Sequence, residues 1–198
     1  ETIENLEDHN SSSYNVAWID LLTSKKSLGR GIISLGEHVE KKKLKLNFKK
    51  LLNIPFYAPS NIISKNIIKS FNIIHFLRSN NQKENVSLLS YFYPLDMLTN
   101  WNRLYGKNGF IQYQFYIPSE NCLENLKYII HKIHSSETYV CLGVLKKFGK
   151  ANNNLLSFPS EGYTLALDFK MSKNTLNFVK ELDQIILDMS GRIYLSKD

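Results

Sequence analysis

Polar side chains alternate with apolar ones along two strand-like stretches in the second half of the chain. Gln112 and Gln114 alternate with apolar residues in residues 110–117, and Thr164 and Asp168 do so in residues 163–169. Because successive side chains of a strand point to opposite sides of a sheet, each stretch should present one polar and one apolar face. The polar face is either a wet outer surface or the floor of a polar binding site, and the residues alone leave both readings open.

Two of the lysines of the second half, Lys146 and Lys197, accompany strand-like stretches. Lys146 is near the end of a strand-like stretch, residues 139–147, and Lys197 follows a shorter one at the end of the chain. An ammonium group can stabilise negative charge that develops in a reaction. An ordinary surface position is the alternative for Lys146, since most lysines are exposed. Asp168 is equally consistent with a structural ion pair to a nearby Lys or Arg.

The cysteines and histidines do not suggest a metal or disulfide site. Cys122 and Cys141 are too few for a disulfide framework, and no cluster of Cys and His has the spacing of a zinc site. His131 and His134 have a spacing that could chelate a metal on a helix, but no carboxylate or cysteine pattern accompanies them. We therefore expect no metal site and a solvent-facing pair of histidines.

The composition predicts one folded, soluble domain. The chain has 198 residues, 43% of them hydrophobic, and no run of about 18 apolar residues that would cross a bilayer. Its start lacks the pattern of a secretory signal, so we expect a cytoplasmic location. The net charge of +7 raises the possibility of nucleic-acid binding. Because Lys, Asn and Ile are frequent along the whole chain, we expect no nucleic-acid partner. The basic residues 40–50 are expected to form a solvated loop.

Strands and helices alternate in the second half of the chain. Strands are expected at residues 110–117, 139–147, 163–169 and 193–195. Ser119 and Ser172 can cap two helices between them. Apolar residues recur on these helices at helical spacing, namely Leu123, Leu126, Ile130 and Ile133 on the first and Leu176, Val179, Leu182, Ile186 and Met189 on the second. The order β-α-β-β-α-β predicts an α+β, ferredoxin-like domain, an antiparallel sheet with its helices mainly on one face.

The first half should extend the same sheet. Residues 14–22 and 31–35 are β-branched and aromatic runs joined by a polar turn, which predicts an antiparallel pair. A short polar helix is expected at residues 2–8. Ser60 can cap a further helix that ends near residue 78, and residues 86–93 should form another strand. The apolar residues at helical spacing in that further helix are Ile63, Ile67, Phe71, Ile74 and Leu77.

Five stretches resemble, in order and spacing, the cap domain of FAD-linked sugar oxidases of the vanillyl-alcohol-oxidase-like family, in its decaprenylphosphoryl-ribose oxidase branch. They are VAWID with GRG, FYPLD with WNRLYG, GFIQYQF, LSFP with GYTLALDF, and the final GRIYLSKD. The match extends over nearly the whole chain except the first dozen residues and residues 40–86. No single stretch is diagnostic, but five in register make coincidence an unsatisfactory explanation.

The resemblance implies that residues 1–198 are a single substrate-binding (cap) domain excised from a larger FAD-dependent oxidoreductase. The chain begins with Glu1 rather than Met, and it contains no Gly-rich nucleotide-binding loop. FAD would therefore be held mainly by the parent's own FAD-binding domain, and the isolated chain should carry no FAD and be inactive. The intact parent would oxidise a sugar-like alcohol, free or lipid-linked, by hydride transfer to flavin.

The resemblance also assigns roles to individual residues. Lys197, by its place in the last stretch, is the candidate catalytic residue, because a cation near the flavin would stabilise the charge left by the arriving hydride. The candidate substrate-binding residues are Gln112, Gln114, Lys146, Thr164, Asp168, Trp18 and Tyr93. Trp18 and Tyr93 are as consistent with the core as with a pocket wall. Mycobacterial members have Asn and Cys where this chain has Thr164 and Ala166, so the same substrate is not implied.

Two other functions fit the residues. An aldonolactone or alditol oxidase would use the same flavin architecture on a small soluble substrate, and a free-standing ferredoxin-like binding module would have no redox role. The basic residues 40–50 and the helix with Lys65 and Lys69 further suggest peripheral contact with an anionic membrane surface, where a lipid-linked sugar would be presented.

Overall fold

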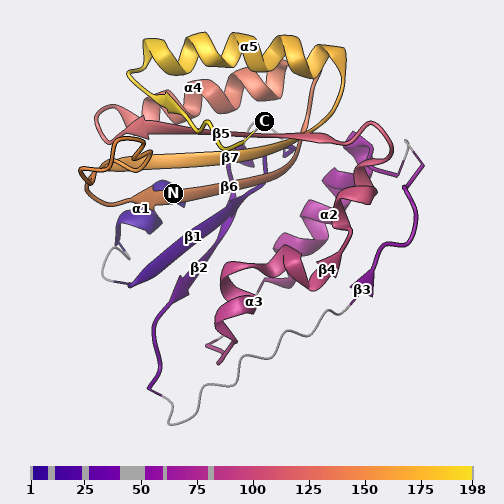
Figure 1. Cartoon of the computed structure of the whole chain (residues 1–198), viewed down its shortest axis with the longest axis horizontal. Coiled ribbons are helices and arrows are strands. Elements are labelled where there is room, and N and C mark those ends of the chain that lie inside the picture. The colour runs from indigo at the N-terminus through magenta and orange to yellow at the C-terminus, as the bar shows by residue number, and fades with distance from the viewer. Residues whose placement is uncertain are drawn as a thin grey trace.

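The six-stranded antiparallel sheet at the centre of the protein has the strand order β2-β1-β6-β7-β5-β8 (Figure 1). The computed structural model describes residues 2–8, 12–23, 27–40, 52–59, 62–79 and 83–197. The predicted α+β class is confirmed.

The second half has the predicted β-α-β-β-α-β order. Its elements are β5 (Phe110–Pro118), α4 (Cys122–Ser135), β6 (Val140–Phe148), β7 (Gly162–Lys170), α5 (Lys173–Asp188) and β8 (Arg192–Ile193). The spatial order β6-β7-β5-β8 places the first and third strands of this unit at its centre, as in a ferredoxin-like sheet. Figure 1 shows α4 and α5 on the same face of the sheet, as predicted.

The core lies between this face and the two helices. On β5 and β7 the predicted alternation is confirmed, since Tyr113 and Leu167 are fully buried beside their apolar neighbours two residues away. The buried helix residues include Leu126, Ile129 and Ile133 on α4 and Phe178, Leu182 and Ile186 on α5. Burial of these side chains is the main source of stability in such a domain.

Of the two helix caps predicted for the second half, one is confirmed and one is wrong. The Ser172 side chain accepts a hydrogen bond from the Thr175 backbone N–H at 3.1 Å and caps α5. For α4 the N-cap is Asn121, not Ser119, because residues 119–121 form a turn whose Ser119 carbonyl accepts from the Cys122 N–H at 3.3 Å. The turn delays the helix by two residues.

The first half extends the sheet as predicted. Helix α1 (Thr2–Asp8) precedes the hairpin of β1 (Tyr14–Ile19) and β2 (Gly31–Gly36), and β1 pairs with β6. Leu6 of α1 is fully buried in the same core as α4 and α5.

The middle of the chain departs from the sequence predictions. It contains β3 (Leu52–Asn53), α2 (Lys65–Arg78), α3 (Leu88–Phe92), the 3-10 helices η2 (Pro94–Met97) and η3 (Trp101–Tyr105), and β4 (Leu98–Thr99), which pairs in parallel with β3. Figure 1 shows α2 and α3 on the opposite side of the sheet from α4 and α5.

The predicted strand at residues 86–93 is wrong, because this segment contains α3. The Ser87 side chain accepts a hydrogen bond from the Ser90 N–H and starts a helical turn, and the Tyr91 hydroxyl donates to the Ser34 carbonyl of β2 at 3.1 Å. The segment therefore contacts the sheet edge through a side chain instead of pairing with it. Ser60 and most of the basic residues 40–50 lie outside the described residues, and α2 starts at Lys65 after Ser64, so the N-cap assigned to Ser60 is wrong.

Candidate functional site

The polar face of the sheet, opposite α4 and α5, is formed by paired positions on three central strands. Gln112 of β5 is paired with Asp168 of β7, and Thr164 of β7 with Lys146 of β6. Gln114 follows Gln112 at the spacing of two that keeps side chains on one face. The alternation that the sequence shows therefore brings these five candidate residues onto one surface.

One part of this surface is a chain of hydrogen bonds from Asp168 to Lys197. The Gln112 amide donates to the Asp168 carboxylate at 2.9 Å, and the Lys197 ammonium donates to the amide oxygen of Gln112. Asp168 is 1% exposed, whereas Gln112 and Lys197 are half-buried. Gln112 is thus held at both ends of its amide, which fixes its orientation.

Lys197 reaches this position through the turn that follows β8. The Tyr194 N–H donates to the Gln114 carbonyl at 2.8 Å, and the Lys197 N–H donates to the Tyr194 carbonyl at 3.3 Å. These bonds fold the end of the chain over β5. The bond of its ammonium group to Gln112 gives the Lys197 side chain a defined position.

A second hydrogen-bonded pair lies beside the first. The Gln114 amide donates to the Thr164 hydroxyl at 3.0 Å, and that hydroxyl donates to the Phe115 carbonyl at 2.8 Å. Thr164 is 1% exposed, so its hydroxyl is satisfied inside the sheet, while the half-buried Gln114 remains accessible. Thr164 therefore serves mainly to orient Gln114, and not to contact a ligand itself.

The two lysines of this face influence each other. Partial desolvation lowers the pKa of Lys146, and the positive charge of Lys197 lowers it further, although the Lys146 side chain remains exposed. Two ammonium groups close enough to repel one another favour an anion between or beside them. The face therefore combines two positive charges at its accessible positions with one buried carboxylate, that of Asp168.

Sequence reasoning missed two groups that shape this face, and the first is Tyr105 of η3. Burial raises the pKa of its hydroxyl, and so do the charge and hydrogen bonding of Asp168. Burial and the Asp168 charge likewise raise the pKa of the Cys141 thiol to about 12, which keeps it protonated and unreactive at neutral pH. Tyr105 belongs to the WNRLYG stretch, the only signal in the sequence that pointed to it.

The second missed group is an aromatic cluster around Phe158. Its ring centroid is 4.7 Å from that of Tyr194, 5.8 Å from Phe148 and 6.5 Å from Tyr116. The Tyr116 hydroxyl also donates to the Glu161 carbonyl at 2.8 Å. This cluster fixes the connection between β6 and β7 against the turn that carries Lys197.

Trp18 and Tyr93 have different positions. Trp18 of β1 is paired with Val144 of β6, so it lies on the polar face next to the central strands, and its ring meets His75 of α2 edge-on at 4.8 Å. Tyr93 is exposed directly after α3, and none of the described contacts joins it to the hydrogen-bonded residues. The structure thus brings Trp18, but not Tyr93, towards the candidate site.

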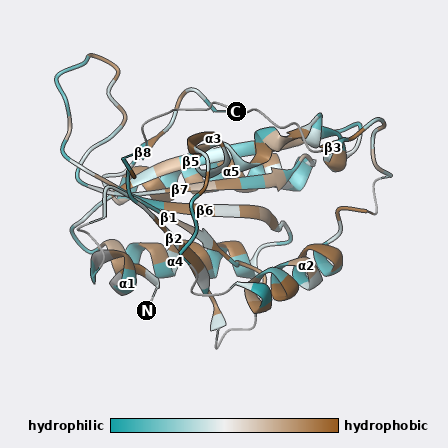
Figure 2. Ribbon diagram, turned by 90° about the horizontal axis from the view of Figure 1, so that it is seen from below, coloured by the Kyte–Doolittle hydropathy of each residue, from teal (hydrophilic) through white to brown (hydrophobic). Residues whose placement is uncertain are grey.

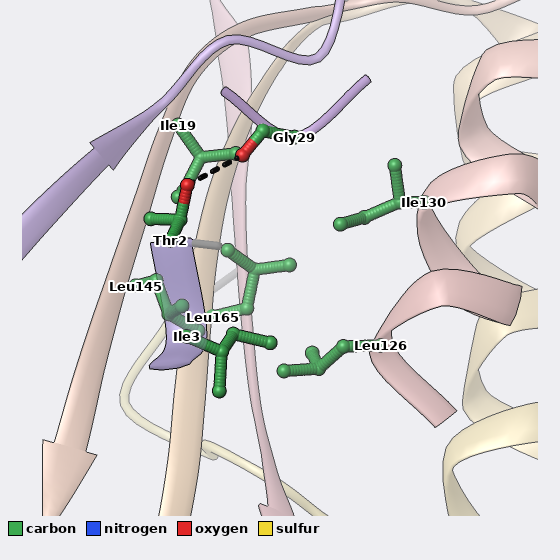
Figure 3. Close-up of a pocket in the computed structure, with 8 residues that line it drawn as sticks. All are labelled: Thr2, Ile3, Ile19, Gly29, Leu126, Ile130, Leu145 and Leu165. Atoms are coloured by element: carbon green, nitrogen blue, oxygen red, sulfur yellow. Dashed lines mark hydrogen bonds between the residues drawn. The ribbon is translucent and has the colours of Figure 1, made fainter. Parts of the chain in front are cut away.

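A small cavity of about 40 Å³ lies on the other face of the sheet, between α1, α4 and the strands (Figure 3). It is lined by Thr2, Ile3, Ile19, Gly29, Leu126, Ile130, Leu145 and Leu165, and the Thr2 hydroxyl donates to the Gly29 carbonyl at 3.0 Å. This volume admits about one or two water molecules and is far too small for a sugar. It is a packing defect of the core and not part of the candidate site.

The described part of the chain contains neither a metal-binding cluster nor a membrane-spanning helix. No three or more His, Cys, Asp or Glu side chains there are grouped to hold a metal ion. None of the helices described is both long enough and apolar enough to cross a membrane.

Comparison with curated proteins shows an extensive similarity. The chain is 36% identical over 196 residues to decaprenylphosphoryl-beta-D-ribose oxidase from Mycolicibacterium smegmatis, which covers 94% of this chain. The resemblance predicted from the sequence is confirmed. The chain spans 42% of the length of that oxidase, so the similarity concerns a part of it.

A second similarity is weaker, and no protein-family model matches the chain. An "Uncharacterized protein in mprA 5'region" from Streptomyces coelicolor is 26% identical over 105 residues, or 52% of this chain and 28% of that protein. The functional argument therefore rests on the similarity to the mycobacterial oxidase.

Proposed function

We propose that the chain is the substrate-binding domain of an FAD-dependent oxidoreductase that oxidises a sugar-like alcohol. The observation that carries this proposal is the position of Lys197, which meets Gln112 on the polar face beside Lys146. The similarity to decaprenylphosphoryl-beta-D-ribose oxidase supports an oxidase, and its name supports a lipid-linked sugar as the class of substrate to test first.

The donors of the polar face fit a flavin and a sugar. The ammonium groups of Lys197 and Lys146 suit the electron-rich end of a flavin ring or an anionic substrate group, and the Gln114 amide suits sugar hydroxyls. When bound, FAD would accept the hydride from the substrate alcohol. The nucleotide part of FAD would be held by the parent's own FAD-binding domain, because the chain has no Gly-rich nucleotide loop.

Each residue of the face has a separate task in this proposal. Lys197 stabilises negative charge that develops beside it during oxidation, and interactions that strengthen in the transition state raise turnover. Asp168 and Thr164 are positioning residues, because they orient the amides of Gln112 and Gln114. Lys146 and Trp18 border the substrate. Peripheral contact with a membrane surface supplies the substrate if it is linked to a lipid.

The proposal is tested with the full-length protein that contains this chain. We expect a flavin absorption spectrum that bleaches under anaerobic conditions when a prenylphosphoryl pentose is added. Bleaching by free alditols or aldonolactones, but not by the prenylphosphoryl sugar, would instead identify the small-substrate oxidase. A purified full-length protein without flavin would exclude both and favour a binding module.

The isolated chain provides the complementary test. We expect it to be colourless and to leave all of these alcohols unchanged, because the FAD-binding domain is absent from it. Stoichiometric yellow flavin in the purified chain would contradict the assignment of FAD binding to the rest of the parent.

A further inference from the structure

Helix α2 exposes several apolar residues that a helix packed on the core would bury. Its exposed apolar residues include Ile67 at 50%, Phe71 at 59%, Ile74 at 50% and Leu77 at 73%. The buried residue of α2 is instead the polar Asn72. Figure 2 shows the apolar stretches along α2 at the margin of the molecule.

Polar contacts fix this orientation of the helix. The Asn72 amide donates to the buried Asp20 carboxylate at 2.9 Å, and that carboxylate also binds the Arg30 guanidinium at 3.0 Å. Nearby, the His75 ring packs on Trp18, and the Phe76 ring lies 4.6 Å from the Arg30 guanidinium. Rotating α2 to bury its aliphatic residues would break these contacts, so its apolar side is held outwards.

The positive charge of the protein is concentrated in the same segment. Residues 41–83 contain ten of the 25 Lys and Arg and none of the 18 Asp and Glu, so the remaining chain has a net charge of −3. Within the described part of this segment, Lys65, Lys69 and Arg78 of α2 are exposed. The basic character is thus a local feature, contrary to the even distribution that we expected from the composition.

We infer that α2 is a membrane-docking helix that inserts Ile67, Ile74 and Leu77 into an anionic lipid surface. An exposed aliphatic side on a helix that also carries basic residues is the combination that binds the boundary between headgroups and acyl chains. The basic residues are complementary to anionic lipids. A second copy of the chain is a poorer occupant, because like charges would meet across the interface. This inference concerns the surface alone and does not depend on the redox function.

The helix is also well placed to serve the candidate site. Trp18 contacts α2 through His75, and it lies on the polar face next to the central strands. A lipid surface bound at α2 would therefore bring the headgroup region towards this face, where a lipid-linked sugar has its polar end.

The test uses the purified chain and sedimentation with vesicles, which requires neither flavin nor substrate. We expect binding to vesicles of phosphatidylcholine with about one third phosphatidylglycerol, and much weaker binding to pure phosphatidylcholine. The double variant Ile74→Asn, Leu77→Asn should weaken the binding about tenfold or more, because both side chains leave the apolar region. The double variant Lys65→Gln, Lys69→Gln should weaken it about fivefold for each lysine, and added salt should reduce this difference.

Matched controls separate this surface from a general effect. Leu155 and Leu156 are at least as exposed as Ile74 and Leu77 but lie in the connection between β6 and β7, so Leu155→Asn, Leu156→Asn should leave binding unchanged. Lys127→Gln, Lys180→Gln removes the same charge from exposed positions on α4 and α5 and should have little effect. Unfolding curves confirm that each variant is folded.

Three results would overturn the inference. They are equal binding to neutral and anionic vesicles, an Ile74, Leu77 variant that binds as tightly as the wild type, and controls that weaken binding as much as the α2 variants. A concentration-dependent dimer that the Ile74, Leu77 variant abolishes, without any vesicle binding by the wild type, would show that the face contacts a second copy. None of these results bears on flavin reduction by the full-length protein.

Discussion

Helices α2 and α5 repeat apolar residues at similar spacing but use them in opposite ways. In α5 the apolar residues Phe178, Leu182 and Ile186 are buried against the sheet. In α2 the residues of this kind, such as Ile74, are half exposed, and a polar network of Asp20, Arg30 and Asn72 attaches the helix. Helical periodicity therefore identifies a helix, whereas the surroundings decide which side of it is buried.

The difference also separates the two faces of the sheet. The face under α4 and α5 is apolar and closed, so it contributes stability. The opposite face presents hydrogen-bonded glutamines and two lysines, with α2 and Trp18 beside them. The features that suggest function lie on the side where the apolar core is absent.

The largest expected effect is a difference in stability between a core variant of α5 and a surface variant of α2. Leu182→Ala should lower the free energy of unfolding by about 3 kcal/mol, because it leaves a cavity in the closed core. Ile74→Ala should change it by less than about 0.5 kcal/mol, because the side chain is half exposed. Urea unfolding of both variants measures the contrast. Equal losses would mean that α2 contributes its apolar face to the core after all.

The polar face is tested in the full-length protein through Lys197. Lys197→Met should slow flavin reduction by a factor on the order of a hundred, the scale for removing one electrostatic stabiliser. Flavin binding and the fold should survive. Lys180→Met on the exposed face of α5 is the control and should react at the wild-type rate in stopped-flow reduction. A wild-type rate for Lys197→Met would remove Lys197 from the reaction.

The polar attachment of α2 is expected to have an intermediate effect. Asp20→Asn should lower the free energy of unfolding by about 2 kcal/mol, because the Arg30 guanidinium loses its buried carboxylate partner. Amide exchange should become faster in α2 and remain slow in α5. Asp188→Asn, at the exposed end of α5, is the control and should have little effect. Unchanged exchange in α2 would show that the helix is attached by other contacts.

The smallest expected effect is on the titration of Lys146. In the isolated chain, Lys197→Met should raise the pKa of Lys146 towards its ordinary value, because a nearby positive charge is removed while the desolvation that lowers the pKa more strongly remains. NMR of isotopically methylated lysines reports this pKa directly. The Lys180→Met control should leave it unchanged, and an unchanged pKa in Lys197→Met would place the two lysines too far apart to interact.

Local patterns were sufficient for part of the candidate site. Alternation along β5 and β7 correctly placed Gln112, Gln114, Thr164 and Asp168 on one face, because side-chain direction in a strand follows from the backbone. Tyr105 and Phe158 were missed, since each joins its partners from a distant part of the chain. The roles assigned to the site residues stay predictions.

The sequence by itself determined the α+β class, the β-α-β-β-α-β order and the strand faces, since each follows from periodicity within a short segment. Only the tertiary structure decided that Asn72 faces inwards, because its partner Asp20 is 52 residues away. It also decided that residues 86–93 contain a helix and that Lys197 meets Gln112 across 85 residues. Contacts of this kind depend on which surfaces remain free once the core has formed, and no local pattern contains that information.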